Sequence, residues 1–153
     1  MATTVSLRGP KKSRTMTSAF DGANFWVGSS EGGFITEIRA SDGAMIGQFE
    51  YGGSPVGGAA FDGANIWVSD LRGRISVLRA SDGGIVASES AITSGINAQG
   101  VASDGTNIWV ANSGSNSVTR GGNCRHSNRH SIGAKKIHGD DSNTRATLDG
   151  RKD

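Results

Sequence analysis

The stretch Ala60-Phe-Asp-Gly-Ala-Asn-Ile-Trp-Val-Ser69 decides the fold, because the 153-residue chain carries this phrase three times. The other copies are Ser18-Ala-Phe-Asp-Gly-Ala-Asn-Phe-Trp-Val27 and Val101-Ala-Ser-Asp-Gly-Thr-Asn-Ile-Trp-Val110. Each copy holds one tryptophan, and the tryptophans lie 41 and 42 residues apart, at Trp26, Trp67 and Trp109. A repeat of about 40 residues with one tryptophan per unit is typical of repetitive all-β architectures.

Each of the first two repeats contains two Asp-Gly turns. In the first repeat, Asp21-Gly-Ala-Asn24 separates two short apolar strands, and Ser41-Asp-Gly43 separates the expected strands Phe34–Ile38 and Met45–Phe49. Such turns favour hairpins, because glycine accepts a positive φ and aspartate bonds its own backbone. The second repeat has the same order. Four short strands per repeat, joined by tight turns, match one blade of a β-propeller.

Three segments carry a resemblance to a known family. Phe61-Asp-Gly-Ala-Asn-Ile-Trp-Val68, the loop Ala111-Asn-Ser-Gly-Ser-Asn-Ser-Val-Thr119 and the turn Leu78-Arg-Ala-Ser-Asp-Gly83 resemble bacterial β-propellers of the YVTN/NHL type. The virginiamycin B lyase-like propellers are similar in style. The resemblance covers about residues 18–120. It implies an all-β partial propeller with two four-stranded blades and part of a third.

The repeats divide the chain into three parts. Residues 1–17 form a basic lead-in that we expect to be disordered, and residues 18–120 hold the repeats, as units 18–58, 59–99 and a partial 100–120. Residues 121–153 contain few apolar and no aromatic residues, so we expect a disordered basic tail. The repeat pattern stops abruptly after Arg120, and a shift of reading frame near that residue is an alternative explanation. We therefore expect the chain to be a fragment of a larger propeller.

The charge distribution argues against nucleic-acid binding. The sequence pI of about 9.0 reflects the two ends, because residues 1–18 and 121–153 have net charges of +4 and +3, whereas residues 19–120 have −5. No apolar run approaches the ~20 residues of a membrane helix, so no membrane contact is expected. Residues 1–16 lack the apolar core of a secretory signal, and the compartment stays open.

Nine residues recur at matching positions of the repeats. These structural repeat positions are Asp21, Asn24, Trp26, Asp62, Asn65, Trp67, Asp104, Asn107 and Trp109. A ring of aspartates is a conceivable cation site, but each loop offers one carboxylate, so we interpret them as turn residues. The tryptophans are conceivable platforms for sugar stacking. Because they lie mid-strand between apolar neighbours, we expect them to pack blade against blade.

The tail contains four side chains of the types that bind zinc. They are Cys124, His126, His130 and His138, and their spacing matches no standard zinc site. A single cysteine also forms no intrachain disulfide. We therefore predict neither a metal site nor a cofactor.

Two functions from different classes remain. The first is a non-catalytic propeller segment that binds a protein or a small molecule, with self-association through open blade faces as a further possibility. The alternative is a fragment of a propeller lyase or hydrolase whose catalytic residues lie in blades outside this sequence. The resemblance implies histidine and acidic residues around a central metal in the lyase branch, and residues 1–125 contain no histidine. No catalytic residue is therefore assigned.

Overall fold

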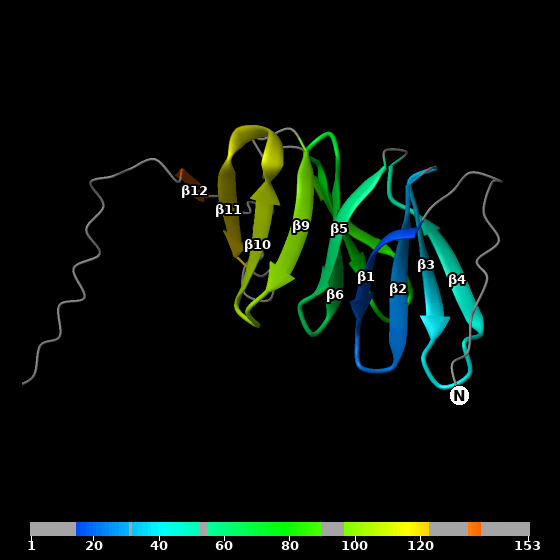
Figure 1. The fold of residues 1–153 in the computed structure, drawn as a ribbon. Coiled ribbons are helices and arrows are strands. Elements are labelled where there is room, and N and C mark those ends of the chain that lie inside the picture. Colours follow the sequence, from blue (N-terminus) through cyan, green and yellow to red (C-terminus); the bar gives the residue numbers. More distant parts are fainter. Residues whose placement is uncertain (1–14, 31, 53–54, 90–96, 123–134, 139–153) are drawn as a thin grey trace, which may run out of the picture.

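A computed structural model describes residues 15–30, 32–52, 55–89, 97–122 and 135–138. These residues form three antiparallel four-stranded sheets, which we call blades A, B and C (Figure 1). Blade A contains β1 (Thr15–Phe20), β2 (Asn24–Ser29), β3 (Phe34–Arg39) and β4 (Met45–Glu50). Blade B contains β5 (Val56–Phe61), β6 (Asn65–Asp70), β7 (Ile75–Arg79) and β8 (Ile85–Glu89).

Blade C completes the set with a fourth strand from the tail. It contains β9 (Ala98–Ser103), β10 (Asn107–Asn112) and β11 (Ser117–Gly122), with the short 3-10 helix η1 (Ser113–Ser115) between the last two. The strand β12 (Lys135–His138) pairs with β11 at the outer edge. The sequence leads us to expect only part of this blade, because residues 135–138 carry no repeat pattern.

The predicted strands and turns of the repeats are present, with small differences at the ends. The strand β1 begins at Thr15, inside the expected lead-in, and β11 continues two residues beyond Arg120. Gly22, Gly63 and Gly105 have positive φ angles of 103°, 96° and 84°, as the hairpin turns require. The remaining residues of the expected disordered ends, 1–14, 123–134 and 139–153, lie outside the described part of the chain.

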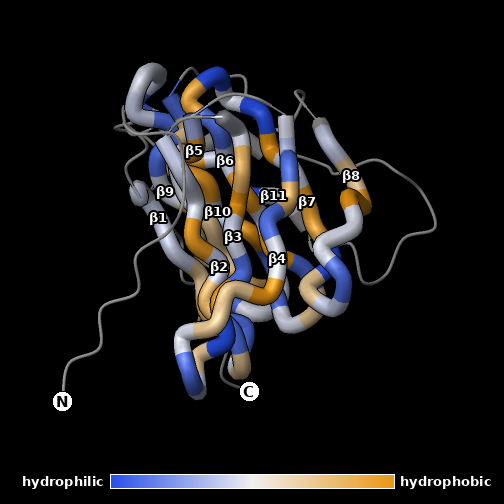
Figure 2. The backbone as a smooth tube through the Cα atoms, turned by 90° about the vertical axis from the view of Figure 1, so that its right-hand side faces the viewer, coloured by the Kyte–Doolittle hydropathy of each residue, from blue (hydrophilic) through white to orange (hydrophobic). Residues whose placement is uncertain are grey.

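The hydrophobic core lies between the blades. One cluster joins blade A to blade B around Trp26, Ile35 and Ile66, and a second joins blade B to blade C around Trp67 and Ile108. Figure 2 shows the hydrophobic segments along the strands and the hydrophilic segments mainly at the turns. The alternation of strand side chains therefore gives each blade two apolar faces, as a strand covered on both sides requires.

The three blades stand side by side in the same orientation. The first strands of the blades, β1, β5 and β9, lie next to one another. The fourth strand of each blade lies at the opposite edge of its sheet. All Asp-Gly turns lie at the lower end in Figure 1, whereas the β2–β3, β6–β7 and β10–β11 loops lie at the upper end. The fold thus separates a lower end of uniform turns from an upper end of dissimilar loops. No helix of the described residues has the length and apolarity needed to cross a membrane.

Candidate functional site

The aspartate and tryptophan of each repeat are joined by a hydrogen bond. The indole Nε1–H of the tryptophan donates to Oδ2 of the aspartate five residues earlier, at 2.7 Å in blade A, 2.7 Å in blade B and 2.8 Å in blade C. The other carboxylate oxygen, Oδ1, accepts the backbone N–H groups two and three residues further on. Each aspartate therefore closes its turn and fixes the indole of its own blade.

These bonds stabilise the charged form of the carboxylates. Burial raises the pKa of Asp62, but hydrogen bonds from Trp67 and from the backbone of Asn65 and Ala64 outweigh it, so the pKa lies below its ordinary value. The same balance lowers the pKa of Asp21. In blade C, the Trp109 indole and two backbone N–H groups hold the pKa of Asp104 well below its usual range. Such carboxylates are poor proton acceptors near neutral pH.

The asparagines of the nine repeat positions behave differently from blade to blade. Asn65 and Asn107 donate from Nδ2 to Oδ2 of their own turn aspartates, at 3.3 and 3.2 Å. Asn24 donates to Oε1 of Glu37, at 2.8 Å, and its side chain also contributes to the hydrogen bonding that lowers the pKa of Asp21. The repeated Asp-Gly phrase predicts turn chemistry at these positions, but it carries no signal for the bond to Glu37.

The strand position opposite the tryptophan holds a residue of different chemistry in each blade. The residue opposite the tryptophan in the neighbouring strand is Glu37 in blade A, Val77 in blade B and Arg120 in blade C. Glu37 is buried, and its burial together with the nearby charge of Asp21 raises the pKa of its carboxyl group. Arg120 is exposed and lies over its tryptophan, with the guanidinium carbon 5.9 Å from the ring centroid.

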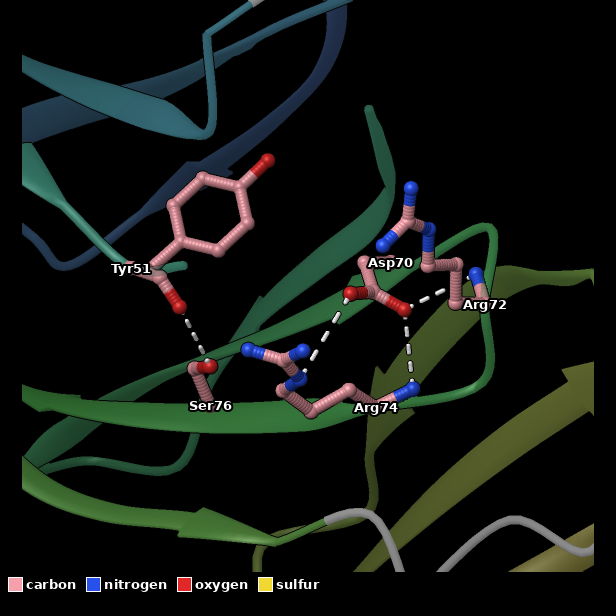
Figure 3. A network of polar contacts seen from close by, with 5 residues as sticks. All are labelled: Tyr51, Asp70, Arg72, Arg74 and Ser76. Carbon is pink, nitrogen blue, oxygen red and sulfur yellow. Dashed lines mark hydrogen bonds and ion pairs between the residues drawn. The ribbon is translucent and has the colours of Figure 1, made fainter. Parts of the chain in front are cut away.

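Polar contacts order the β6–β7 loop of blade B at the upper end and join blade B to the segment that follows blade A (Figure 3). Asp70 ends β6, and its Oδ1 accepts the backbone N–H groups of Arg72 and Arg74 at 2.9 and 2.8 Å. The Nε of Arg74 lies 3.9 Å from the Oδ2 of Asp70. The Ser76 hydroxyl donates to the carbonyl oxygen of Tyr51 at 3.0 Å. The Asp70 contacts therefore order the β6–β7 loop within blade B, and the Ser76 bond joins β7 to the segment that connects the two blades.

Tyr51 lies at one side of this contact region, where its carbonyl oxygen accepts from Ser76 (Figure 3). Its ring belongs to the core cluster between blades A and B. Burial and the charge of Asp70 raise the pKa of the Tyr51 phenol well above its ordinary value, so the group stays neutral. The sequence gives no signal for this arrangement, because Tyr51 and Asp70 come from different repeats and neither recurs at its position.

Three of the four candidate metal ligands of the tail lie outside the described residues. Cys124, His126 and His130 lie outside the described residues, and His138 ends β12. Within the described part of the chain, no group of three or more histidine, cysteine, aspartate or glutamate side chains is arranged to hold a metal ion.

Comparison with known proteins identifies the fold. The U3-55K structure aligns over 86% of this chain and 39% of its own, with a TM-score of 0.70 and 14% identity. The WD40 repeats of RRP9 align over 82% and 37%, with a TM-score of 0.67 and 14% identity. Hydrazine synthase of Kuenenia stuttgartiensis aligns over 76% and 36%, with a TM-score of 0.62 and 19% identity.

These likenesses decide the architecture. The chain has a β-propeller fold. It spans less than two fifths of the length of each of these three structures. No protein-family model matches the sequence, and no curated protein matches it either. The likeness at such low identity concerns the fold alone, so the chemistry of a site has to be argued from this chain's own residues.

Proposed function

We propose that this chain is a YVTN/NHL-type propeller segment that acts as a non-catalytic binding scaffold through the loops of its upper end. One observation carries the proposal: the two ends of the blades use their polar residues differently. At the lower end the turns repeat, and both oxygens of each turn aspartate accept hydrogen bonds from the same blade. At the upper end the three loops differ in sequence, so each presents different chemistry.

The upper loops combine a fixed backbone with exposed polar side chains. The backbone of Arg72 is bound to Asp70, while the residue itself is exposed. In blade C, Ser113 and Asn116 are exposed, and the backbone N–H of Ser113 donates to the carbonyl oxygen of Asn97 at 3.0 Å. A loop whose backbone is already ordered loses less conformational entropy when it binds a ligand. This arrangement supports recognition of a protein segment or a small polar molecule.

A ligand screen with two matched variants tests the proposal. Purified chain is screened by thermal shift against a panel of peptides and free sugars of stated charge, and each hit is titrated. We expect Arg72→Ala to weaken binding by about 5- to 50-fold, because arginine is enriched among the interface residues whose truncation costs more than about 1 kcal/mol. Thr106→Ala is the control, because it reproduces at the lower end the alanine of the other two turns.

The outcome also separates the two functional classes. Binding that Arg72→Ala weakens and Thr106→Ala leaves unchanged supports the scaffold. Equal binding by both variants places the site elsewhere and contradicts the proposal. The lyase or hydrolase alternative places the catalytic residues in blades outside this sequence, so histidines or paired acids on the loops at one mouth of a complete homologue would instead support it.

A further inference from the structure

The two contacts inside the chain show how one blade binds the next. We call the sheet face that carries the tryptophan the Trp face, and the opposite sheet face the reverse face. The Trp face of blade A, with Trp26, packs on Ile66 and Val68 of the reverse face of blade B. The Trp face of blade B, with Trp67, packs on Ile108 of the reverse face of blade C. The same positions of the repeat thus form the same contact twice.

The Trp face of blade C is the first of two uncovered faces. Register places Val118 of blade C where blade B has Ile75. Val118 is 39% exposed, whereas Ile75 is fully buried. Trp109 is half-buried, although Trp67 at the same position is 1% exposed. Among the described residues, no further sheet covers this face.

The reverse face of blade A is the second face that no further sheet of the described residues covers. Phe25 occupies the position of Ile66 in blade B, but it is 43% exposed, whereas Ile66 is fully buried. Phe20 is 49% exposed and stands beside Phe25, with ring centroids 4.9 Å apart. Its counterpart Phe61 packs against the core cluster of blades A and B. Exposed aromatic side chains that adjoin in this way mark interaction surfaces.

Gly100 of β9 gives independent support for another blade beside blade C, as a comparison with Gly58 of β5 shows. A Cβ added to Gly58 of β5 would lie 2.8 Å from the backbone nitrogen of Val101 and 2.9 Å from the carbonyl oxygen of Gln99, so glycine permits close approach of β9. Gly100 holds the same position in β9. A Cβ there would meet only Ala111 of its own blade, at 3.5 Å. The described structure therefore has space beside Gly100 for another first strand.

We propose that the chain self-associates head to tail, the Trp face of blade C of one copy packing on the reverse face of blade A of a second copy. The two surfaces hold the positions that already pack together twice within one chain, with Arg120 over Trp109 at the position where blade B has Val77. Gly100 then lies against β1 of the second copy, as Gly58 lies against β9. The contact is heterologous, so it leads to a closed ring or a longer chain of blades. The inference is independent of the ligand-binding role proposed above.

Single-face variants test this contact. Phe25→Glu places a carboxylate on the reverse face of blade A, and Gly100→Glu places one beside the Trp face of blade C. Analytical ultracentrifugation of the unaltered chain at concentrations on the order of 100 μM should show species of at least twice 15.7 kDa. Each variant alone should remain monomeric, with self-association weakened at least about a hundredfold, because the new charge is buried without a partner.

A mixture of the two variants makes the test specific. The Phe25→Glu copy keeps its blade C face and the Gly100→Glu copy keeps its blade A face, so the equimolar mixture should form a dimer and nothing larger. Val118→Glu, also on the blade C face, replaces Gly100→Glu if the latter loses cooperative unfolding by circular dichroism. The proposal is overturned by an unaltered chain that stays monomeric, by single variants that still associate, or by a mixture of folded variants that does not dimerise.

Discussion

Blades B and C have closely similar second strands, yet their tryptophans have different surroundings. Trp67 lies between blades B and C and is buried, whereas Trp109 lies on a face that no other described strand covers. Both indoles make the same hydrogen bond to an aspartate five residues earlier. The local turn therefore forms in the same way in both places, and burial depends on the neighbouring blade. Residues close together in the sequence therefore form the hairpin, whereas the core forms only where two blades pack against each other.

The largest expected effect is on the buried tryptophan. Trp67→Ala should lower the free energy of unfolding by about 3–5 kcal/mol, because it leaves a cavity between blades B and C. Trp109→Ala should cost roughly half as much, since part of its indole is already in contact with solvent. Chemical denaturation monitored by circular dichroism, at a concentration where the chain is monomeric, measures both. Equal losses for the two variants would contradict the difference in burial.

Trp26→Ala is the matched control for this comparison. Trp26 is fully buried between blades A and B, and its ring stacks on Phe49 with centroids 5.5 Å apart. We therefore expect its replacement to resemble Trp67→Ala rather than Trp109→Ala. A small loss at Trp26 would show that the contact between blades A and B is looser than the contact between blades B and C.

The second prediction concerns the aspartates of the turns. Asp62→Asn should destabilise the chain by about 1.5–3 kcal/mol, because the charged hydrogen bond to Trp67 and those to the backbone are weakened in a buried turn. Asp104→Asn should have a smaller effect, since Asp104 is exposed and water can replace the lost partner. The same denaturation series measures both variants. A larger loss at Asp104 would contradict the role given to burial.

Much of the fold follows from the repeated phrase. The Asp-Gly pairs place the hairpin turns, and the apolar runs on either side place the strands, because both depend on residues close together in the sequence. The five-residue spacing from aspartate to tryptophan is also constant. That spacing could have predicted the hydrogen bond between the indole and the carboxylate. The sequence prediction instead treats the aspartate as a turn residue and the tryptophan as a core residue, with no bond between them.

Contacts between distant residues could not be predicted in the same way. Tyr51 and Asp70 meet only because blades A and B pack side by side, and neither residue belongs to the repeated phrase. The pairing of β12 with β11 likewise follows no repeat pattern. The burial of Glu37 could not be predicted for another reason. Glu37 occupies a strand position that is valine in blade B, so only the register of the strands shows that a carboxyl group is buried there.

Acid titration should reveal the stabilising aspartates. The pKa values of Asp21, Asp62 and Asp104 are lower in the folded chain than their ordinary value near 3.8. Their stabilising contribution is therefore complete above that value and is lost as the pH falls below it towards the folded pKa values. Unfolding free energies measured between pH 6 and pH 2 (about the range where carboxyl groups titrate) should decline most steeply below about pH 4. In Asp62→Asn this decline should be shallower.

The smallest effect should come from Glu37, whose behaviour is opposite to that of the turn aspartates. Burial and the charge of Asp21 raise its pKa above the ordinary value of 4.5, so the folded chain binds the Glu37 proton more tightly than the unfolded chain does. Its contribution to stability is therefore complete below pH 4.5 and declines as the pH rises through the folded pKa. Glu37→Gln keeps an oxygen that accepts from Asn24 and removes the charge, so it should raise the thermal midpoint slightly at pH 7 and leave it unchanged near pH 4. A variant that is less stable than the unaltered chain at pH 7 would show that the charge itself holds Asn24 in place.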